Sequence, residues 1–152
     1  MSQHLRFVWI ESETELRLIL DAPLDPSKLK VYEAQKVLKF SILSHEPNRI
    51  RLKLDEKLDF SKNYEVSYHH EKIFAYFSLQ VLNNFFYSDE KLGSFFIDKK
   101  VSVKIWSPPA LTVEVCVYAQ DAKTLLGKKE LARKKNGIWE EVLSPEEFGI
   151  KT

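Results

Sequence analysis

The sequence predicts an all-β protein of two antiparallel β-sandwich modules in tandem, the second of them incomplete at its C-terminal end. Three observations lead to this prediction. Apolar and polar residues alternate with a period of two along most of the chain, as in half-buried strands. Turn-forming residues separate these runs at intervals of about ten to twelve residues, which is typical of a sandwich. No long segment has the period of an amphipathic helix.

The first module is expected to span residues 1–84. Its clearest strands alternate apolar residues with charged or polar ones, and they comprise residues 15–20, 49–54 and 64–68. Proline, asparagine, aspartate and serine mark the turns at residues 21–27, 46–48 and 61–63. Trp9 lies between Val8 and Ile10, and we expect it in the core.

The boundary between the modules is expected near residues 83–89, where Asn-Asn and Ser-Asp-Glu interrupt the pattern. Residues 78–84 are the best candidate for a helix, although they also fit a strand that runs into a linker. An aromatic cluster follows at Phe85, Phe86 and Tyr87. Because exposed aromatic patches usually mark contacts, we expect this cluster to pack between the modules.

The second module is expected to span residues 85–152. Its predicted strands are residues 93–97, 101–106, 112–118 and 138–142. Gly127 is expected to allow one turn, and Lys135-Asn-Gly137 is a strong signal for another. The residues after this last strand are too few for another full strand, so we expect a truncated module with an unpaired strand edge. A dimer that pairs such edges is one consequence.

Composition and charge exclude several classes of function. The net charge of +1, with Lys and Arg dispersed among Asp and Glu, argues against nucleic acid as a partner. No stretch approaches the roughly 20 apolar residues of a membrane span. The N-terminus lacks the apolar core of a signal peptide, and the single cysteine fits a reducing compartment, so we expect a cytoplasmic protein.

The sequence contains no convincing catalytic or metal-binding set. The carboxylate pairs Asp55-Glu56 and Glu146-Glu147 are adjacent in sequence and lie in expected turns, where solvated loops explain them. His69 and His70 would point to opposite faces of a strand, and zinc needs three or four convergent ligands. Cys116 has no basic neighbours and is expected to be a small buried residue. We therefore expect no catalysis, no metal and no cofactor for this chain.

Sugar binding is the one chemistry with candidate residues, Trp106 and Trp139. Aromatic rings stack on the apolar face of a sugar, while polar groups around them bind its hydroxyls. By strand alternation Trp106 lies opposite Val103 and Ile105, and Trp139 lies opposite Ile138, so both could face outward. The alternative, which burial statistics favour, is that one packs in the core and the other against a neighbouring domain.

Four segments carry a family resemblance, in order along the chain: residues 87–93, 100–108, 113–118 and 136–140. They include a strand that ends in Trp-Ser-Pro, a valine-rich strand and an Asn-Gly-Ile-Trp hairpin. Together they resemble the carbohydrate-binding module family 48 domain, which precedes the catalytic barrel in type I pullulanases and related enzymes of glycoside hydrolase family 13. Residues 4–84, through segments 18–25 and 58–66, resemble the immunoglobulin-like domain in front of that module.

The sequence also departs from this family. The glycine expected before Leu92-Gly93 is replaced within residues 88–91. The Tyr-rich strand and the barrel that follow in the family are absent, and a barrel alone needs roughly 200 residues or more. The resemblance implies a non-catalytic accessory region of an α-glucan debranching enzyme that docks on the catalytic barrel and contacts glucan weakly. The alternative is a free-standing immunoglobulin-like interaction or adhesion module.

Overall fold

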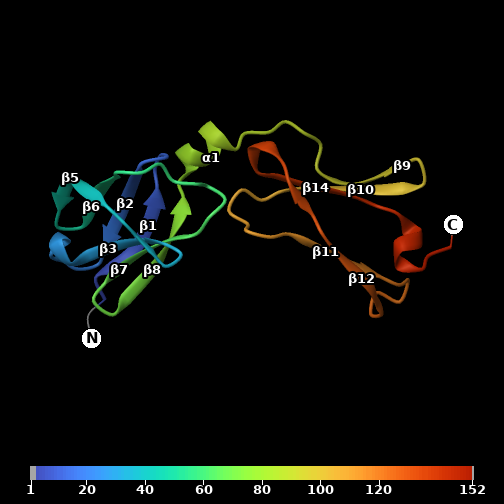
Figure 1. Cartoon of the computed structure of the whole chain (residues 1–152), viewed down its shortest axis with the longest axis horizontal. Coiled ribbons are helices and arrows are strands. Elements are labelled where there is room, and N and C mark those ends of the chain that lie inside the picture. Colours follow the sequence, from blue (N-terminus) through green and yellow to red (C-terminus); the bar gives the residue numbers. More distant parts are fainter. Residues whose placement is uncertain (1–2, 152) are drawn as a thin grey trace. The chain divides into compact units, whose positions relative to one another are not determined.

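The computed structural model describes residues 3–151, and these form two compact units (Figure 1). Unit 1 ends at Asn84 and unit 2 begins at Phe85. Strands dominate both units, and the one α-helix within the described residues is the seven-residue α1, Leu79–Phe85. The predicted all-β, sandwich-type fold is confirmed. Residues 78–84 thus supply the helix that the sequence allowed rather than the strand.

Unit 1 contains eight strands hydrogen-bonded in the order β4-β3-β7-β8-β1-β2-β6-β5. Their bounds are β1 Leu5–Ile10, β2 Glu15–Leu20, β3 Leu29–Glu33, β4 Lys36–Leu38, β5 Phe40–Glu46, β6 Arg49–Leu54, β7 Tyr64–Tyr68 and β8 Glu71–Phe77. Strand β8 joins two halves of this arrangement. Its first residues pair with β7 in antiparallel fashion, and Ala75, Tyr76 and Phe77 pair with β1 in parallel. One strand therefore passes from one sheet of the sandwich to the other.

The core of unit 1 follows from the alternation that the sequence shows. Every second residue of β2 and β6 is buried, and their fully buried members include Leu16, Leu18, Ile50 and Leu52. In β3 and β7 the corresponding positions are Leu29, Val31, Tyr64, Val66 and Tyr68. The predicted strands at 15–20, 49–54 and 64–68 are confirmed. Burial of these side chains, worth about 1.5–3 kcal/mol each, holds the unit together.

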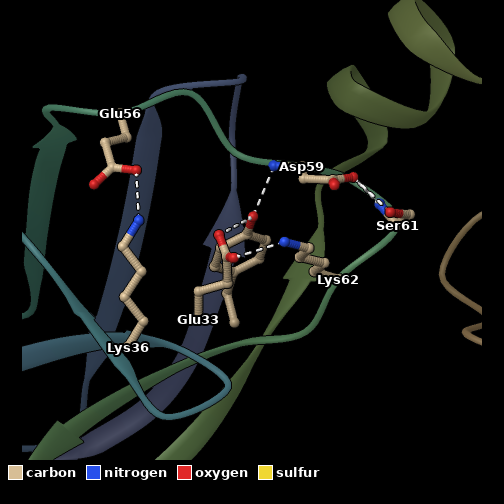
Figure 2. Close-up of polar contacts among 7 residues, drawn as sticks. Glu33, Lys36, Glu56, Asp59, Ser61 and Lys62 are labelled. Carbon is tan, nitrogen blue, oxygen red and sulfur yellow. Dashed lines mark hydrogen bonds and ion pairs between the residues drawn. The ribbon is translucent and has the colours of Figure 1, made fainter.

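A polar cluster closes one end of this core around Tyr64, whose side chain is only 1% exposed. The Tyr64 hydroxyl donates a hydrogen bond to Glu33 Oε2 (3.0 Å) and accepts one from the backbone N–H of Asp59 (2.7 Å). Lys62 Nζ donates to the other Glu33 oxygen at 3.0 Å, as Figure 2 shows. Burial raises the pKa of Tyr64, so its hydroxyl stays protonated and able to donate.

Replacing Glu33 with glutamine is expected to make the free energy of unfolding of unit 1 depend less on pH at acid pH. The hydrogen bond from Lys62 lowers the pKa of Glu33 below its ordinary value of 4.5. The resulting stabilisation is complete above the unfolded-state pKa and is lost as the pH falls through the lower folded-state pKa. Denaturant unfolding of wild type and Glu33→Gln from about pH 7 to pH 3 measures this difference. Parallel profiles for the two proteins would contradict the assignment.

Unit 2 contains a four-stranded sheet in the order β13-β14-β10-β9 and a two-stranded hairpin, β11-β12. The bounds are β9 Gly93–Ile97, β10 Lys100–Trp106, β11 Glu114–Tyr118, β12 Leu125–Glu130, β13 Ala132–Arg133 and β14 Ile138–Leu143. The turn predicted at Lys135-Asn-Gly137 is confirmed, because Asn136 (φ 58°) and Gly137 (φ 77°) both have the left-handed backbone of a tight turn. Strand β9 lies at one edge of the sheet.

The turn predicted at Gly127 is wrong, because Gly127 lies inside β12. Asp121 makes the actual turn: its Oδ1 accepts the backbone N–H groups of Lys123 and Thr124, both at 2.9 Å. Gly127 is instead a point of close approach, since a Cβ there would lie 2.7 Å from the Phe148 ring. A glycine inside a strand fits either role, and periodicity alone does not separate them.

Three further expectations about single residues are wrong. Trp9 is not a core residue but lies half-buried on the outer face of its sheet, opposite Arg17 and Tyr76. Cys116 is exposed rather than buried, because its neighbours Val115 and Val117 take the inward positions of β11. His69 and His70 lie in the turn between β7 and β8 and not in a strand.

The aromatic cluster at the start of unit 2 is uneven in exposure. Phe86 is 7% exposed, whereas Tyr87 is 71% exposed. That this cluster packs between the modules stays a prediction.

Candidate functional site

Trp106, the first candidate sugar-binding residue, ends strand β10 with its side chain 38% exposed. The indole N–H is fixed by two backbone carbonyls, Phe86 O at 2.8 Å and Asn136 O at 3.1 Å. The segment before β9 and the turn before β14 thus both orient the ring. With its polar atom already bonded to the protein, the exposed part of Trp106 is an apolar ring surface, which suits stacking rather than hydrogen bonding.

Trp139, the second candidate, is buried at 3% exposure. Its indole N–H donates to Ser107 O at 3.0 Å, and the Arg133 guanidinium lies 5.1 Å from the ring centroid. Arg133 in turn donates to the carbonyls of Ala110 (2.7 Å) and Pro108 (3.0 Å). Trp139 therefore packs as the internal support of the loop that follows Trp106, and a sugar-binding role for it stays a prediction.

The two tryptophans lie on neighbouring strands, because β10 and β14 pair with Ile105 opposite Trp139 and Trp106 opposite Ile138. They belong to opposite faces of the sheet, as the alternation requires. The structure does not bring them together into one sugar-stacking surface. It makes Trp106 the exposed member and Trp139 the buried one.

An apolar cavity of about 320 Å³ lies between the four-stranded sheet and the β11-β12 hairpin of unit 2. Its lining includes Val101, Val103, Val115, Val117, Leu143 and Phe148. Such a lining offers few partners for sugar hydroxyls, which need hydrogen-bonding groups. The cavity therefore lacks the polar side chains that would orient a sugar.

Two of the four carboxylates that the sequence singled out, Glu56 and Glu147, have structural partners. Glu56 pairs with Lys36 at 2.9 Å, and Glu147 pairs with Lys129 at 3.2 Å. Glu147 also accepts the Ser144 N–H in a capping box, and the hydrogen bond from Lys129 is the main cause that lowers the pKa of this carboxyl. A glycosidase acid needs a raised pKa, so the arrangement around Glu147 is opposite to that requirement.

Within residues 3–151 no group of three or more His, Cys, Asp or Glu side chains is arranged to hold a metal ion. None of the helices in that same range has the length and apolar character that a membrane crossing requires.

Sequence reasoning missed a second aromatic surface, on the outer face of the sheet that contains β8, β1, β2 and β6. It contains Trp9, Phe7 (45% exposed) and Tyr76 (54% exposed) on β1 and β8. Strand β1 reads apolar on both faces, and a register shift between Leu5 and Phe7 hides its alternation. The outward direction of Trp9 was detectable only from its pairing with the charged Arg17.

The fold defines a class of protein, a chain of two β-sandwich-type units. Comparison with known proteins identifies solved structures that contain the same fold. No protein-family model matches the chain, and no curated protein matches it. Solved structures of pullulanases do. A pullulanase of Group B Streptococcus matches with a TM-score of 0.75 and 19% identity over 99% of this chain and 20% of the pullulanase.

Two further pullulanases contain a region with the same fold as this chain. That of Bacillus acidopullulyticus matches with a TM-score of 0.75 and 10% identity over 93% of this chain and 32% of its own. That of Anoxybacillus sp. LM18-11, solved with maltotetraose, matches with a TM-score of 0.68 and 16% identity over 91% and 20%. This chain thus spans between about a fifth and a third of these pullulanases. At such identities the similarity shows a shared fold.

Proposed function

We propose that this chain is a non-catalytic accessory region of an α-glucan debranching glycosidase of the pullulanase type. In this proposal unit 1 is the immunoglobulin-like domain and unit 2 the family 48 carbohydrate-binding module. The region docks on the catalytic barrel and contacts glucan weakly through Trp106. The observation that carries the proposal is the match of 99% of this chain, both units together, to part of one pullulanase.

Exposed apolar residues of unit 2 support the docking role. Phe96 and Ile97 of the edge strand β9 are 88% and 56% exposed, and Leu92 just before it is 47% exposed. Exposed apolar clusters of this kind usually mark contacts with a partner. A folded domain that covers this edge would also protect its unpaired backbone groups from other strands.

The geometry of Trp106 supports a weak glucan contact. One fixed, partly exposed ring can stack on one sugar unit, but a single ring with its N–H already bonded offers no further polar contact. We therefore expect affinity for glucan in the millimolar range, well below that of an enclosed sugar site.

Titration of the chain with maltohexaose and with a branched dextrin, followed by tryptophan fluorescence and calorimetry, tests the glucan contact. Saturable binding that falls at least tenfold in Trp106→Ala is expected. Docking is tested by sedimentation of the chain with the streptococcal pullulanase from which the matching segment is deleted. Association that is lost in Phe96→Asp is expected. If neither glucan nor the pullulanase binds, the proposal is overturned.

A further inference from the structure

The apolar cavity of unit 2 is bounded by three parts of the unit. Strands β10 and β14 form one wall, β11 forms the second, and the 3₁₀ turn Pro145–Phe148 with Ile150 closes one end. The cavity has a volume of about 320 Å³, and because a water molecule takes about 30 Å³ in the liquid, it has room for roughly ten groups of that size. This volume is in the range of sites that bind small molecules.

The cavity is left unfilled because of two residues that β12 directs toward the four-stranded sheet. Gly127 is the register partner of Val117, and Lys129 is that of Val115, so both share the face of the hairpin that bears these valines. Gly127 has no side chain, and the Lys129 side chain extends to Glu147, at 3.2 Å, rather than ending among apolar groups. Neither position supplies a branched apolar side chain, and the space between the sheet and the hairpin therefore stays open.

Phe148 forms a preformed end wall of the cavity. A Cβ at Gly127 would lie 2.7 Å from the Phe148 ring, so this ring occupies the space that a larger residue at position 127 would need. The turn that carries Phe148 is held by the capping box of Ser144 and Glu147 and by the ion pair of Glu147 with Lys129. Contacts with β12 thus fix the wall before any ligand enters, which lowers the entropic cost of binding.

The lining selects a ligand that is apolar and uncharged. Valines of the two facing walls form the interior: Val101, Val103, Val115 and Val117. Among the lining residues that the structure describes, none carries a charge, and the polar side-chain groups are the Cys116 thiol and the Tyr118 hydroxyl. Both residues are exposed, as is Ile150, so these three mark the open mouth. A ligand with a charge or several hydroxyls would lose its hydration inside without gaining hydrogen-bond partners.

We propose that this cavity binds a small uncharged molecule with an alkyl or alkyl-aromatic skeleton of about ten carbon atoms. Removal of the ligand and of the valine side chains from water supplies the binding free energy. The site includes neither Trp106 nor strand β9, so it goes beyond the proposed function and does not depend on it. Glucan titrations and docking experiments can fail while this inference stands.

Titration of the whole chain with n-butylbenzene, an uncharged compound of matching size, tests the proposal by calorimetry and by methyl NMR. We expect saturable binding with a negative heat-capacity change, the mark of apolar burial. The methyl signals of the four cavity valines should shift, whereas those of Val31 and Val66 in the core of unit 1 should not. The charged counterpart 4-butylbenzoate should bind at least tenfold more weakly, because its carboxylate finds no partner inside.

Substitutions that fill the cavity give the second test. Val103→Phe and Val115→Phe add a ring from opposite walls, and each should lower the affinity for n-butylbenzene at least tenfold. Val142→Phe is the matched control, since Val142 is exposed on β14 and does not line the cavity, and it should leave the affinity unchanged. Circular dichroism checks that each variant folds, and the methyl shifts of the wild type keep the test valid if the two filling variants do not.

Four results would overturn the inference. The first is the absence of saturable n-butylbenzene binding, and the second is binding that shifts methyl groups elsewhere but not those of the cavity valines. The third is an equal or higher affinity for 4-butylbenzoate, which would mean that a charged group near the mouth, such as Lys129, defines the ligand. The fourth is a concentration-dependent dimer, seen by sedimentation, that Val103→Phe abolishes while n-butylbenzene does not bind, because a second copy of the chain would then fill the cavity.

Discussion

Leu52→Ala is expected to destabilise unit 1 by about 2–5 kcal/mol, a large part of the stability of a small domain. Leu52 is fully buried and lies in β6 between β2 and β5, opposite Leu16 and Ile42. Truncation removes buried apolar atoms and leaves a cavity that the flanking strands are held too firmly to close. Hydrogen exchange of unit 1 peptides measures the change, because a chain with two units need not unfold in one step.

Leu43→Ala is the matched control for this substitution. Leu43 lies on the neighbouring edge strand β5, at the point where its register with β6 shifts, and it is 48% exposed. The same atoms are deleted, but little buried area is lost, so the expected cost is below about 1 kcal/mol. Equal costs for the two variants would show that the face of β6 bearing Leu52 does not form the core of the unit.

The fold was predictable where one face of a strand is buried and the other is charged. In β2 and β6 each apolar residue alternates with a charged or outward one, and the core positions Leu16, Leu18, Ile50 and Leu52 follow directly. In β1 that signal fails, because Trp9 is outward although its neighbours are apolar. In β11 the alternation holds, with Val115 and Val117 inward and Cys116 outward, and the expectation of a buried cysteine followed its residue type instead.

The candidate site was predictable only in part, for a related reason. Strand alternation allowed both Trp106 and Trp139 to face outward, whereas the pairing of β10 with β14 puts them on opposite faces of the sheet, with exposures of 38% and 3%. Which of them is buried depends on contacts with the loop after β10: the Trp139 indole N–H donates to Ser107 O, and Arg133, which lies over the Trp139 ring, donates to Pro108 O. The Ser107–Trp139 and Pro108–Arg133 contacts join residues more than twenty positions apart, and no local pattern encodes them.

Gly137→Ala is expected to destabilise unit 2 by more than about 2 kcal/mol, because two costs add at this residue. The left-handed backbone (φ 77°) costs an L-residue about 1–2 kcal/mol. A Cβ would also lie 2.6 Å from Pro108 Cγ and 3.1 Å from Pro108 Cα, and the second of these is backbone that cannot rotate away. The Gly137 carbonyl accepts the Ser107 N–H at 2.9 Å, so the strain falls on the loop that carries Trp106.

Gly149→Ala separates the two costs, since Gly149 has nearly the same φ (73°) but nothing within 4 Å of an added Cβ. It should show only the backbone cost of about 1–2 kcal/mol. Gly137→Ala should exceed it and should also shift the tryptophan fluorescence, because Asn136 O, next to Gly137, accepts the Trp106 indole N–H at 3.1 Å. Equal stability losses in the two variants, with unchanged fluorescence, would mean that Pro108 yields to the new methyl group. Trp106 would then be held by Phe86 O rather than by this turn.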